Sequence, residues 1–106
     1  MAVLKIVWTK TAIKQRNFIF EYWKNRNGNT TYINKLNKLV KERLLLLLQN
    51  PKLGKLSEHE GARMVSMRHY SIFYKHLDNR IIIIGFWDNR QDPMKLLSYL
   101  RSKPLK

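Results

Sequence analysis

The sequence contains no cysteine, and this absence excludes a disulfide framework, a cysteine-ligated zinc or iron–sulfur centre and a thiolate nucleophile. Long hydrophobic runs are also missing. The longest one, Leu44 to Leu48, is far shorter than the ~20 apolar residues that a membrane-spanning helix needs. The N-terminus has neither a basic leader before an apolar stretch nor a cleavage site, so we expect no secretion signal and a cytoplasmic location.

Acidic residues are scarce as well, since 7 Asp and Glu stand against 21 Lys and Arg, a formal net charge of +14 over 106 residues. With 44% hydrophobic residues the chain is too apolar for a charged disordered tail, so this charge must lie on a folded surface. The length fits a single domain, residues 1–106. A fold that carries so much like charge indicates an acidic or polyanionic partner.

The first half of the chain predicts a strand followed by two helices. Residues 3–8 are β-branched and aromatic and predict the strand. Thr9 or Thr11 is then expected to cap a helix over residues 10–24, and the Asn- and Gly-rich residues 25–29 form a loop. In the second helix, capped by Thr30 or Thr31 and stopped by Pro51, one apolar stripe runs through Ile33, Leu36, Val40, Leu44 and Leu47.

The second half predicts a small sheet. After a polar stretch over residues 50–61, strands are expected at residues 62–67, 70–76 and 80–87, with Asp78 and Asn79 in a hairpin turn between the last two. Ile81 to Ile84 is continuously apolar, so this strand is expected to be central and buried on both faces. Asp92 and Pro93 predict a cap for a short helix over residues 93–100. The order β-α-α-β-β-β-α indicates an α+β domain with a helical hairpin on one face of a mainly antiparallel sheet.

Such a sheet leaves its other face open, and basic side chains on or beside the strands are expected to line it: Arg63, Arg68, Lys75 and Arg90. Aromatic side chains alternate with them, which is the composition of a surface that stacks bases and binds phosphates, although Tyr70, Ile72 and Tyr74 share one face and are better interpreted as core. We expect Arg90, which follows the buried strand directly, to be placed rigidly for binding a target, with Lys75 and Trp87 as further contacts.

The sequence offers no pattern for a metal site or another cofactor. The only close pairs of acids are Glu58 with Glu60 and Asp88 with Asp92, and the histidines lack the spacing of ligands. Metal-free RNA cleavage stays open, because it needs only cations at the phosphorane and groups that transfer protons. Arg63, Arg68 and Arg90 are candidates for the first role, and Glu58, His59 or His69 for the second.

The order of elements and three short stretches resemble the RelE/ParE superfamily of toxins from bacterial type II toxin–antitoxin modules. The stretches are Gly61-Ala62-Arg63-Met64-Val65, Tyr70-Ser71-Ile72-Phe73-Tyr74 and the segment from Phe86 to Pro93. The resemblance implies a small basic toxin held inactive by a co-encoded antitoxin, acidic and partly disordered, that docks on the first two helices and the sheet edge. One branch cleaves messenger RNA on the ribosome, and the other is associated with poisoning of DNA gyrase.

The departures from the cleaving branch favour the ParE branch. Ser71 stands where the cleaving members commonly have an arginine, and Ala62 and Met64 stand where they tend to have lysines. Arg90 matches a basic position of that branch, whereas Arg90-Gln91-Asp92-Pro93 looks more like ParE. We therefore expect a ParE-like toxin that binds gyrase. The alternatives are a ribosome-dependent endoribonuclease that uses Arg63, Arg68 and Arg90, and a non-toxic basic RNA-binding module.

Overall fold

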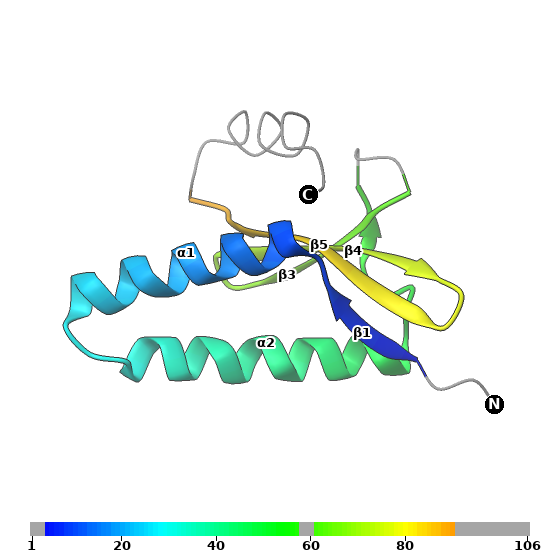
Figure 1. The fold of residues 1–106 in the computed structure, drawn as a ribbon. Coiled ribbons are helices and arrows are strands. Elements are labelled where there is room, and N and C mark those ends of the chain that lie inside the picture. The colour runs from blue at the N-terminus through cyan, green and yellow to red at the C-terminus, as the bar shows by residue number, and fades with distance from the viewer. Residues whose placement is uncertain (1–3, 58–60, 91–106) are drawn as a thin grey trace.

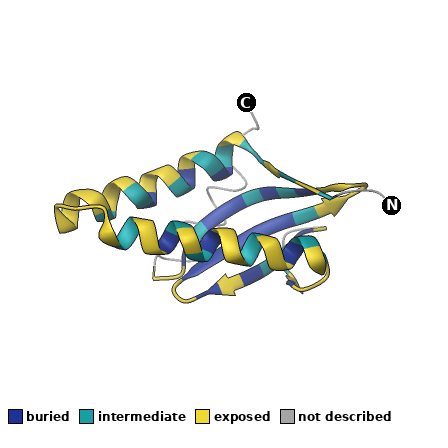
Figure 2. Cartoon of the chain, turned by 90° about the horizontal axis from the view of Figure 1, so that it is seen from below, coloured by how far each residue is buried: buried dark blue, intermediate teal, exposed yellow. Residues whose placement is uncertain are grey.

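Two helices lie on one face of a five-stranded sheet in the computed structural model, which describes residues 4–57 and 61–90 (Figure 1). The helices are α1 (Lys10–Asn27) and α2 (Thr31–Gln49). Seen from the helix side, the residues that face the sheet are buried and the outer faces and the tip of the hairpin are exposed (Figure 2). The expected α+β fold is confirmed. The expected helix at 93–100, with its cap, lies outside the described residues.

The sheet is mixed, and its strand order is β1-β5-β4-β3-β2. Strand β1 (Lys5–Trp8) pairs in parallel with β5 (Arg80–Asp88), which pairs antiparallel with β4 (Tyr70–Leu77). β4 in turn pairs antiparallel with β3 (Arg63–Met67). Asp78, in the turn between β4 and β5, has φ 54°, as expected for a tight hairpin. The mainly antiparallel pairing expected from the sequence is confirmed.

A fifth strand, β2 (Lys55–Leu56), lies within residues expected to be a polar connection. Two residues are too short to give a hydrophobic period, so tertiary contacts decide this strand. The hydroxyl of Tyr74 donates to the carbonyl of Pro51 at 2.7 Å and accepts from the amide of Gly54 at 2.9 Å, which fixes the loop before β2. A Cβ at Gly54 would lie 2.8 Å from both the Met64 carbonyl oxygen and the Tyr74 ring, so only glycine fits there.

The helix ends follow capping chemistry. Thr9 Oγ1 accepts from the Ala12 amide at 3.2 Å, which confirms the expected cap of α1. The helix runs three residues beyond the expected Lys24, because Gly28, at φ 71°, closes it in the left-handed conformation. Thr30 is the N-cap residue of α2, as expected, but its side chain makes no capping hydrogen bond. Asn29 Oδ1 instead accepts from the Thr31 amide at 3.1 Å.

The core lies between the helices and the sheet. Tyr70, Ile72 and Tyr74 are fully buried on the helix side of β4, as expected. Strand β5 has a partner on each side, but the expectation that both its faces are buried is wrong. Ile81 and Ile83 are buried, whereas Ile82 and Ile84 are half-buried, because α1 and α2 cover one face alone.

A β-bulge in β5 sets the geometry of everything that follows it. Phe73 pairs with Gly85 and Tyr74 with Ile83, so Ile84 is the extra residue. Beyond the bulge the alternation is shifted by one, which turns Phe86 and then Asp88 toward the helices. The side chain of Gln15 from α1 accepts from the Phe86 amide at 2.9 Å and so anchors this stretch of β5 to the helix.

Candidate functional site

An arginine and a carboxylate two residues apart form the centre of the candidate site at the end of β5. Asp88 Oδ1 accepts from Arg90 Nε at 2.9 Å and Oδ2 accepts from Arg90 Nη2 at 2.8 Å, a bidentate pair. The Arg90 amide also donates to Asp88 Oδ1 at 2.9 Å. Arg90 is therefore held in one orientation although its side chain is 41% exposed, against 10% for Asp88.

This pairing shifts the pKa of both groups. The hydrogen bonds that Arg90 donates to Asp88 raise the pKa of Arg90 above its ordinary value, despite partial burial that lowers it. Burial alone would raise the pKa of Asp88, but the hydrogen bonds and the charge of Arg90 outweigh it and hold that pKa below its ordinary value. Both groups are therefore charged throughout the physiological range.

Two tyrosines extend the cluster across the core. Arg90 Nη2 donates to the hydroxyl of Tyr70 at 3.1 Å, and this hydroxyl lies 2.8 Å from that of Tyr32 on α2. Burial, followed by the hydrogen bond with Tyr32, raises the pKa of Tyr70 well above its ordinary value. Tyr70 is consequently neutral at physiological pH. The chain Asp88–Arg90–Tyr70–Tyr32 links the end of the sheet to α2.

Trp23 on α1 forms an aromatic support for two arginines. The guanidinium carbon of Arg90 lies 4.9 Å from the Trp23 ring centre, and that of Arg26 lies 5.7 Å from it. Arg26 Nη1 also donates to the Tyr22 hydroxyl at 3.1 Å. Tyr22 meets Trp23 edge to face, with ring centres 5.1 Å apart. Arginines from opposite ends of the sequence are thus brought to one indole ring.

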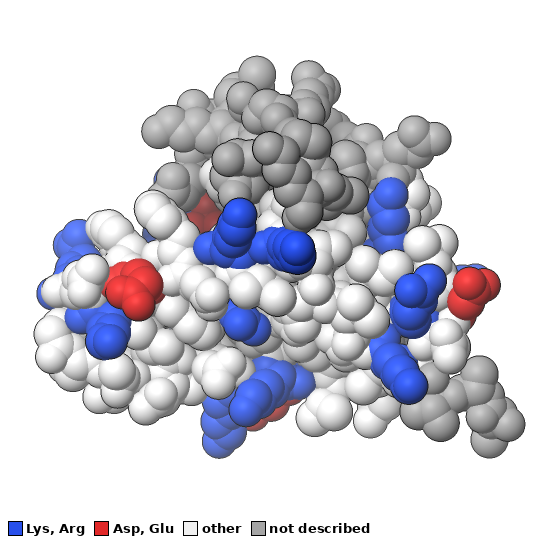
Figure 3. Space-filling view, in the orientation of Figure 1, with Lys and Arg blue, Asp and Glu red and all other residues white. Residues whose placement is uncertain are grey.

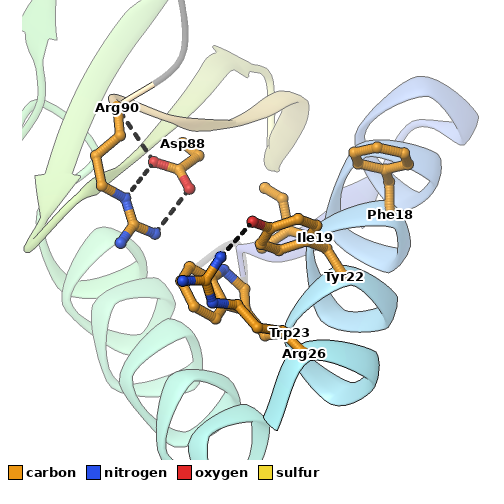
Figure 4. A pocket seen from close by; sticks show the side chains of 7 residues that line it. All are labelled: Phe18, Ile19, Tyr22, Trp23, Arg26, Asp88 and Arg90. Carbon is orange, nitrogen blue, oxygen red and sulfur yellow. Dashed lines mark hydrogen bonds and ion pairs between the residues drawn. The ribbon is translucent and has the colours of Figure 1, made fainter.

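These groups border a surface pocket of about 270 Å³ between α1 and the end of β5 (Figure 4). We call it the α1 pocket, and the residues that line it are Phe18, Ile19, Tyr22, Trp23, Arg26, Asp88 and Arg90. In Figure 4 the Asp88–Arg90 pair faces the side chains of α1 across the hollow. The wall of the α1 pocket is therefore mainly aromatic on the helix side and charged on the strand side.

The other two arginines proposed for RNA cleavage differ in their position relative to Arg90. Arg63 Nη1 donates to the carbonyl of Gly54 at 2.9 Å, so its side chain supports the loop before β2. It begins β3, about 13 Å along the strand from Met67, where β3 ends. Arg68 lies at the same end of the sheet as Arg90, exposed in the β3–β4 turn with φ 57°. The structure does not bring Arg63 together with Arg90.

The residues expected to contact a target are split between two faces of the sheet. By alternation, Lys75 and Trp87 lie on the face away from the helices, whereas Arg90 turns toward α1. The expectation that this far face is open is wrong at its centre. Ser71 and Phe73 are buried there, and Ser71 Oγ donates to Oδ1 of Asn89, the residue that directly follows β5, at 2.7 Å.

The sequence does not reveal the residues that surround Arg90 and hold its side chain. In the sequence, Asp88 is notable only as an acid near Asp92, and no pattern marks Trp23 or Tyr32 as site residues. One signal was present: Phe18, Tyr22 and Arg26 are spaced at i, i+4 and i+8, which places them on one helix face. That face joins Arg90 only through the fold.

The described residues offer no group of three or more His, Asp or Glu side chains that could hold a metal ion. Glu58 and His59, considered for proton transfer, lie outside the described residues, and His69 is exposed in the β3–β4 turn. Lys and Arg side chains occur in several separate groups on the face seen in Figure 3. The positive charge on this face does not form one continuous patch.

Comparison with known families decides the identity of this fold. Residues 6–93 match the family model of the ParE toxin of the type II toxin–antitoxin system parDE. The chain belongs to the ParE toxin family. It is therefore the toxin component of a type II toxin–antitoxin system, and the expected resemblance, with its preference for the ParE branch, is confirmed. Membership implies a cognate antitoxin as partner.

The fold of this ParE-family toxin is similar to a chain of the chromosomal ParDE TA system from P. aeruginosa, with a TM-score of 0.72. The two chains are 20% identical, and the match covers 83% of this chain and 98% of the other. At this identity the likeness concerns the fold. Comparison with curated proteins gives no match. None of the described helices is long and apolar enough to cross a membrane.

Proposed function

We propose that this ParE-family toxin stops growth by binding DNA gyrase, without a chemical step of its own, and that an acidic antitoxin neutralises it. The observation that carries the proposal is the state of Arg90. A cation that stabilises a phosphorane must direct its charge at the substrate, but Asp88 already takes two of its donors in a bidentate pair. This geometry supports an Arg90 that keeps one orientation and binds a target, rather than one that neutralises a developing charge.

The groups around Arg90 are also poorly suited to transfer protons. A general acid or base works best with a pKa near the operating pH. The pKa of Arg90 is raised by its hydrogen bond to Asp88, and that of Tyr70 is raised by burial and by Tyr32, so both keep their protons at pH 7. Together with the separation of Arg63 from Arg90, this supports inhibition by binding over RNA cleavage.

The target contact is best sought on two surfaces. Lys75 and Trp87 lie on the face of the sheet away from the helices, and Arg90 lies at the end of β5 on the helix side. Lys75 is half-buried and pairs with Ile82, so its backbone is held in the sheet rather than in a loop. We propose that Lys75, Trp87 and Arg90 contribute to binding of the target.

The test is to induce the toxin alone and to score growth. Gyrase supercoiling and DNA cleavage are measured with the purified protein, and message cleavage is measured in the induced cells. We expect arrest of growth, inhibition of gyrase supercoiling or accumulation of cleaved DNA, and intact messages. Lys75→Glu and Arg90→Ala should weaken gyrase inhibition at least tenfold. Lys38→Glu, which reverses an exposed charge on α2, is the matched control and should leave inhibition unchanged.

Two other outcomes would replace the proposal. Cuts in translated messages at fixed codon positions, lost in Arg90→Ala, would identify a ribosome-dependent endoribonuclease. Absence of any growth effect, with RNA binding that weakens with salt at a slope of about −0.7 per phosphate contacted on a single strand, would identify a basic RNA-binding module.

A further inference from the structure

Two cations lie side by side where the parallel strands β1 and β5 begin. Lys5, the first residue of β1, pairs with Arg80, the first residue of β5, and both are exposed. The pair points to the face away from the helices, because the next pair, Ile6 with Ile81, packs on the core. Like charges opposite each other on neighbouring strands destabilise a sheet, so stability does not explain this pair.

No acid neutralises these two cations. The Asp88–Arg90 pair is the one ion pair in the part of the chain that the structure describes. Asp78, in the turn between β4 and β5, is close to Arg80 in the sequence, but it forms no ion pair with any described residue. Lys5 and Arg80 are therefore available to an anion from outside the chain.

Two lysines extend the positive charge across the same face. Lys75 pairs with Ile82 and Lys55 pairs with Met64, so by alternation both lysines lie on the face away from the helices. Lys75 is a diagonal neighbour of Arg80, about 7–8 Å away along the sheet. Strands lie about 4.8 Å apart, so from β1 to β2 the cations span about 19 Å. We call these residues the sheet cation band: Lys5, Arg80, Lys75 and Lys55.

The sheet cation band is carried by paired strands, which fix the positions of its residues. The amide of Lys5 donates to the carbonyl of Asn79 at 2.9 Å and so fastens the start of β1 to the β4–β5 turn. Strand β1 and this hairpin lie at the end of the sheet that is far from the loop between α1 and α2 (Figure 1). Because β5 begins at Arg80 and ends at Asp88, the Lys5–Arg80 pair and the α1 pocket lie at opposite ends of this strand.

The length of the band and the side chains beside it indicate which anion fits. B-DNA carries a phosphate about every 3.4 Å along each strand, so a band of about 19 Å meets several phosphates. Single-stranded nucleic acids are bound by aromatic side chains that stack on bases, but Val7 and Leu77, which flank Lys5 and Arg80, are aliphatic and exposed. Aliphatic side chains suit deoxyribose, which lacks the 2′-hydroxyl of RNA.

We propose that the sheet cation band binds the phosphate backbone of duplex DNA, with Lys5 and Arg80 on adjacent phosphates. The inference rests on the proposed function only for the choice of duplex DNA, the substrate of gyrase, and it adds a direct contact between the toxin and DNA. Phosphate contacts position a protein on DNA without reading its sequence, so this binding is independent of base sequence.

The test measures binding of the purified toxin to a short fluorescent DNA duplex, without gyrase, between about 50 and 200 mM salt. Lys5→Gln and Arg80→Gln should each reduce the slope of log affinity against log salt by about 0.9, the value for one phosphate contact on B-DNA. Each should also lower the affinity about fivefold to tenfold at about 0.1 M salt. The matched controls, Lys38→Gln and Lys41→Gln, remove the same charge from exposed positions on α2 and should bind as the unmodified toxin does.

Thermal unfolding separates this role from a structural one. Arg80→Gln removes a like charge beside Lys5, so the variant should melt no lower than the unmodified toxin. A lower melting temperature with an unchanged salt slope would show that Arg80 supports the fold, and would overturn the inference.

Three other results would also overturn it. The first is a salt slope of Lys5→Gln and Arg80→Gln equal to that of the controls. The second is binding of duplex RNA as tight as that of DNA, and the third is equal competition by polyglutamate at the same concentration of charge. Because the assay contains no gyrase, each of these results leaves the proposed function intact, and the growth and gyrase assays decide that function separately.

Discussion

Asp88 and Arg90 are two residues apart, and their side chains meet in a bidentate ion pair of 2.8 and 2.9 Å at the end of β5. The bulge at Ile84 makes this possible, because it turns Asp88 to the helix side, where Arg90 stacks on Trp23. The pair is thus a local contact in sequence whose direction is set by the sheet. It fixes an arginine that contacts buried Tyr70 and also lines the α1 pocket.

Asp88→Asn tests the contribution of this pair to stability. We expect a loss of about 1 kcal/mol in the free energy of unfolding at pH 7, since Arg90 is partly exposed and solvent weakens the pair. Urea unfolding followed by tryptophan fluorescence measures it. Asp78→Asn, in the exposed β4–β5 turn where asparagine accepts the same positive φ, is the control and should cost almost nothing.

The same pair predicts a pH dependence on the acid side. The pKa of Asp88 is lower in the folded protein than its unfolded value near 4, so the stabilisation is fully present above about pH 4. It is lost as the pH falls through the folded pKa. The difference in unfolding free energy between the unmodified protein and Asp88→Asn should therefore shrink below pH 4. A difference that stays constant down to pH 2 would contradict the assignment.

Tyr70→Phe tests the buried tyrosine and predicts the opposite pH dependence. The folded protein binds the phenolic proton of Tyr70 more tightly than the unfolded chain, whose tyrosines titrate near pH 10. Stability is therefore lost as the pH rises above about 10, and Tyr70→Phe should show a smaller loss over that range. At pH 7 the variant should lose about 1 kcal/mol for the hydrogen bonds to Tyr32 and Arg90. Unfolding in urea at pH 7, 9 and 11 measures both effects.

Gly54→Ala tests the close contact that holds β2. The added Cβ would lie 2.8 Å from the Met64 carbonyl oxygen and from Tyr74, so the loop must move. We expect a loss of about 1–3 kcal/mol, the range for overpacking. In Gly85→Ala the new Cβ would meet Phe73 at 3.4 Å, and the cost should be clearly smaller. Equal melting temperatures for the two variants would contradict this interpretation.

Arg63→Ala separates a structural arginine from a functional one. Because Arg63 Nη1 donates to the Gly54 carbonyl, its loss should lower stability by about 1 kcal/mol. Growth inhibition by the induced variant should be unchanged after correction for the amount of folded protein. If Arg63→Ala abolished toxicity at full stability, the residue would belong to the active surface.

Local sequence patterns identified most helices and strands, because the periodicity and capping that define these elements involve residues close together in the chain. The apolar stripe from Leu36 to Leu47 predicted α2, and Thr9 predicted the start of α1. β2 escaped because it has two residues and depends on Tyr74, which is distant in sequence. The same limit applies to the candidate site: Arg90 was identified from its place after a strand, but Trp23 and Tyr32 were not associated with it.

By itself, the sequence determined the α+β order, the core tyrosines of β4 and the family, since these follow from periodicity, composition and short motifs carried by consecutive residues. Only the tertiary structure decided on which face of the sheet these charged and aromatic side chains lie. The bulge at Ile84 sends Asp88 and Arg90 to the helix side, while Lys75 and Trp87 stay on the other face. Side-chain direction in a sheet changes with one inserted residue, and that insertion is set by pairing with β4 and by Gln15 of α1.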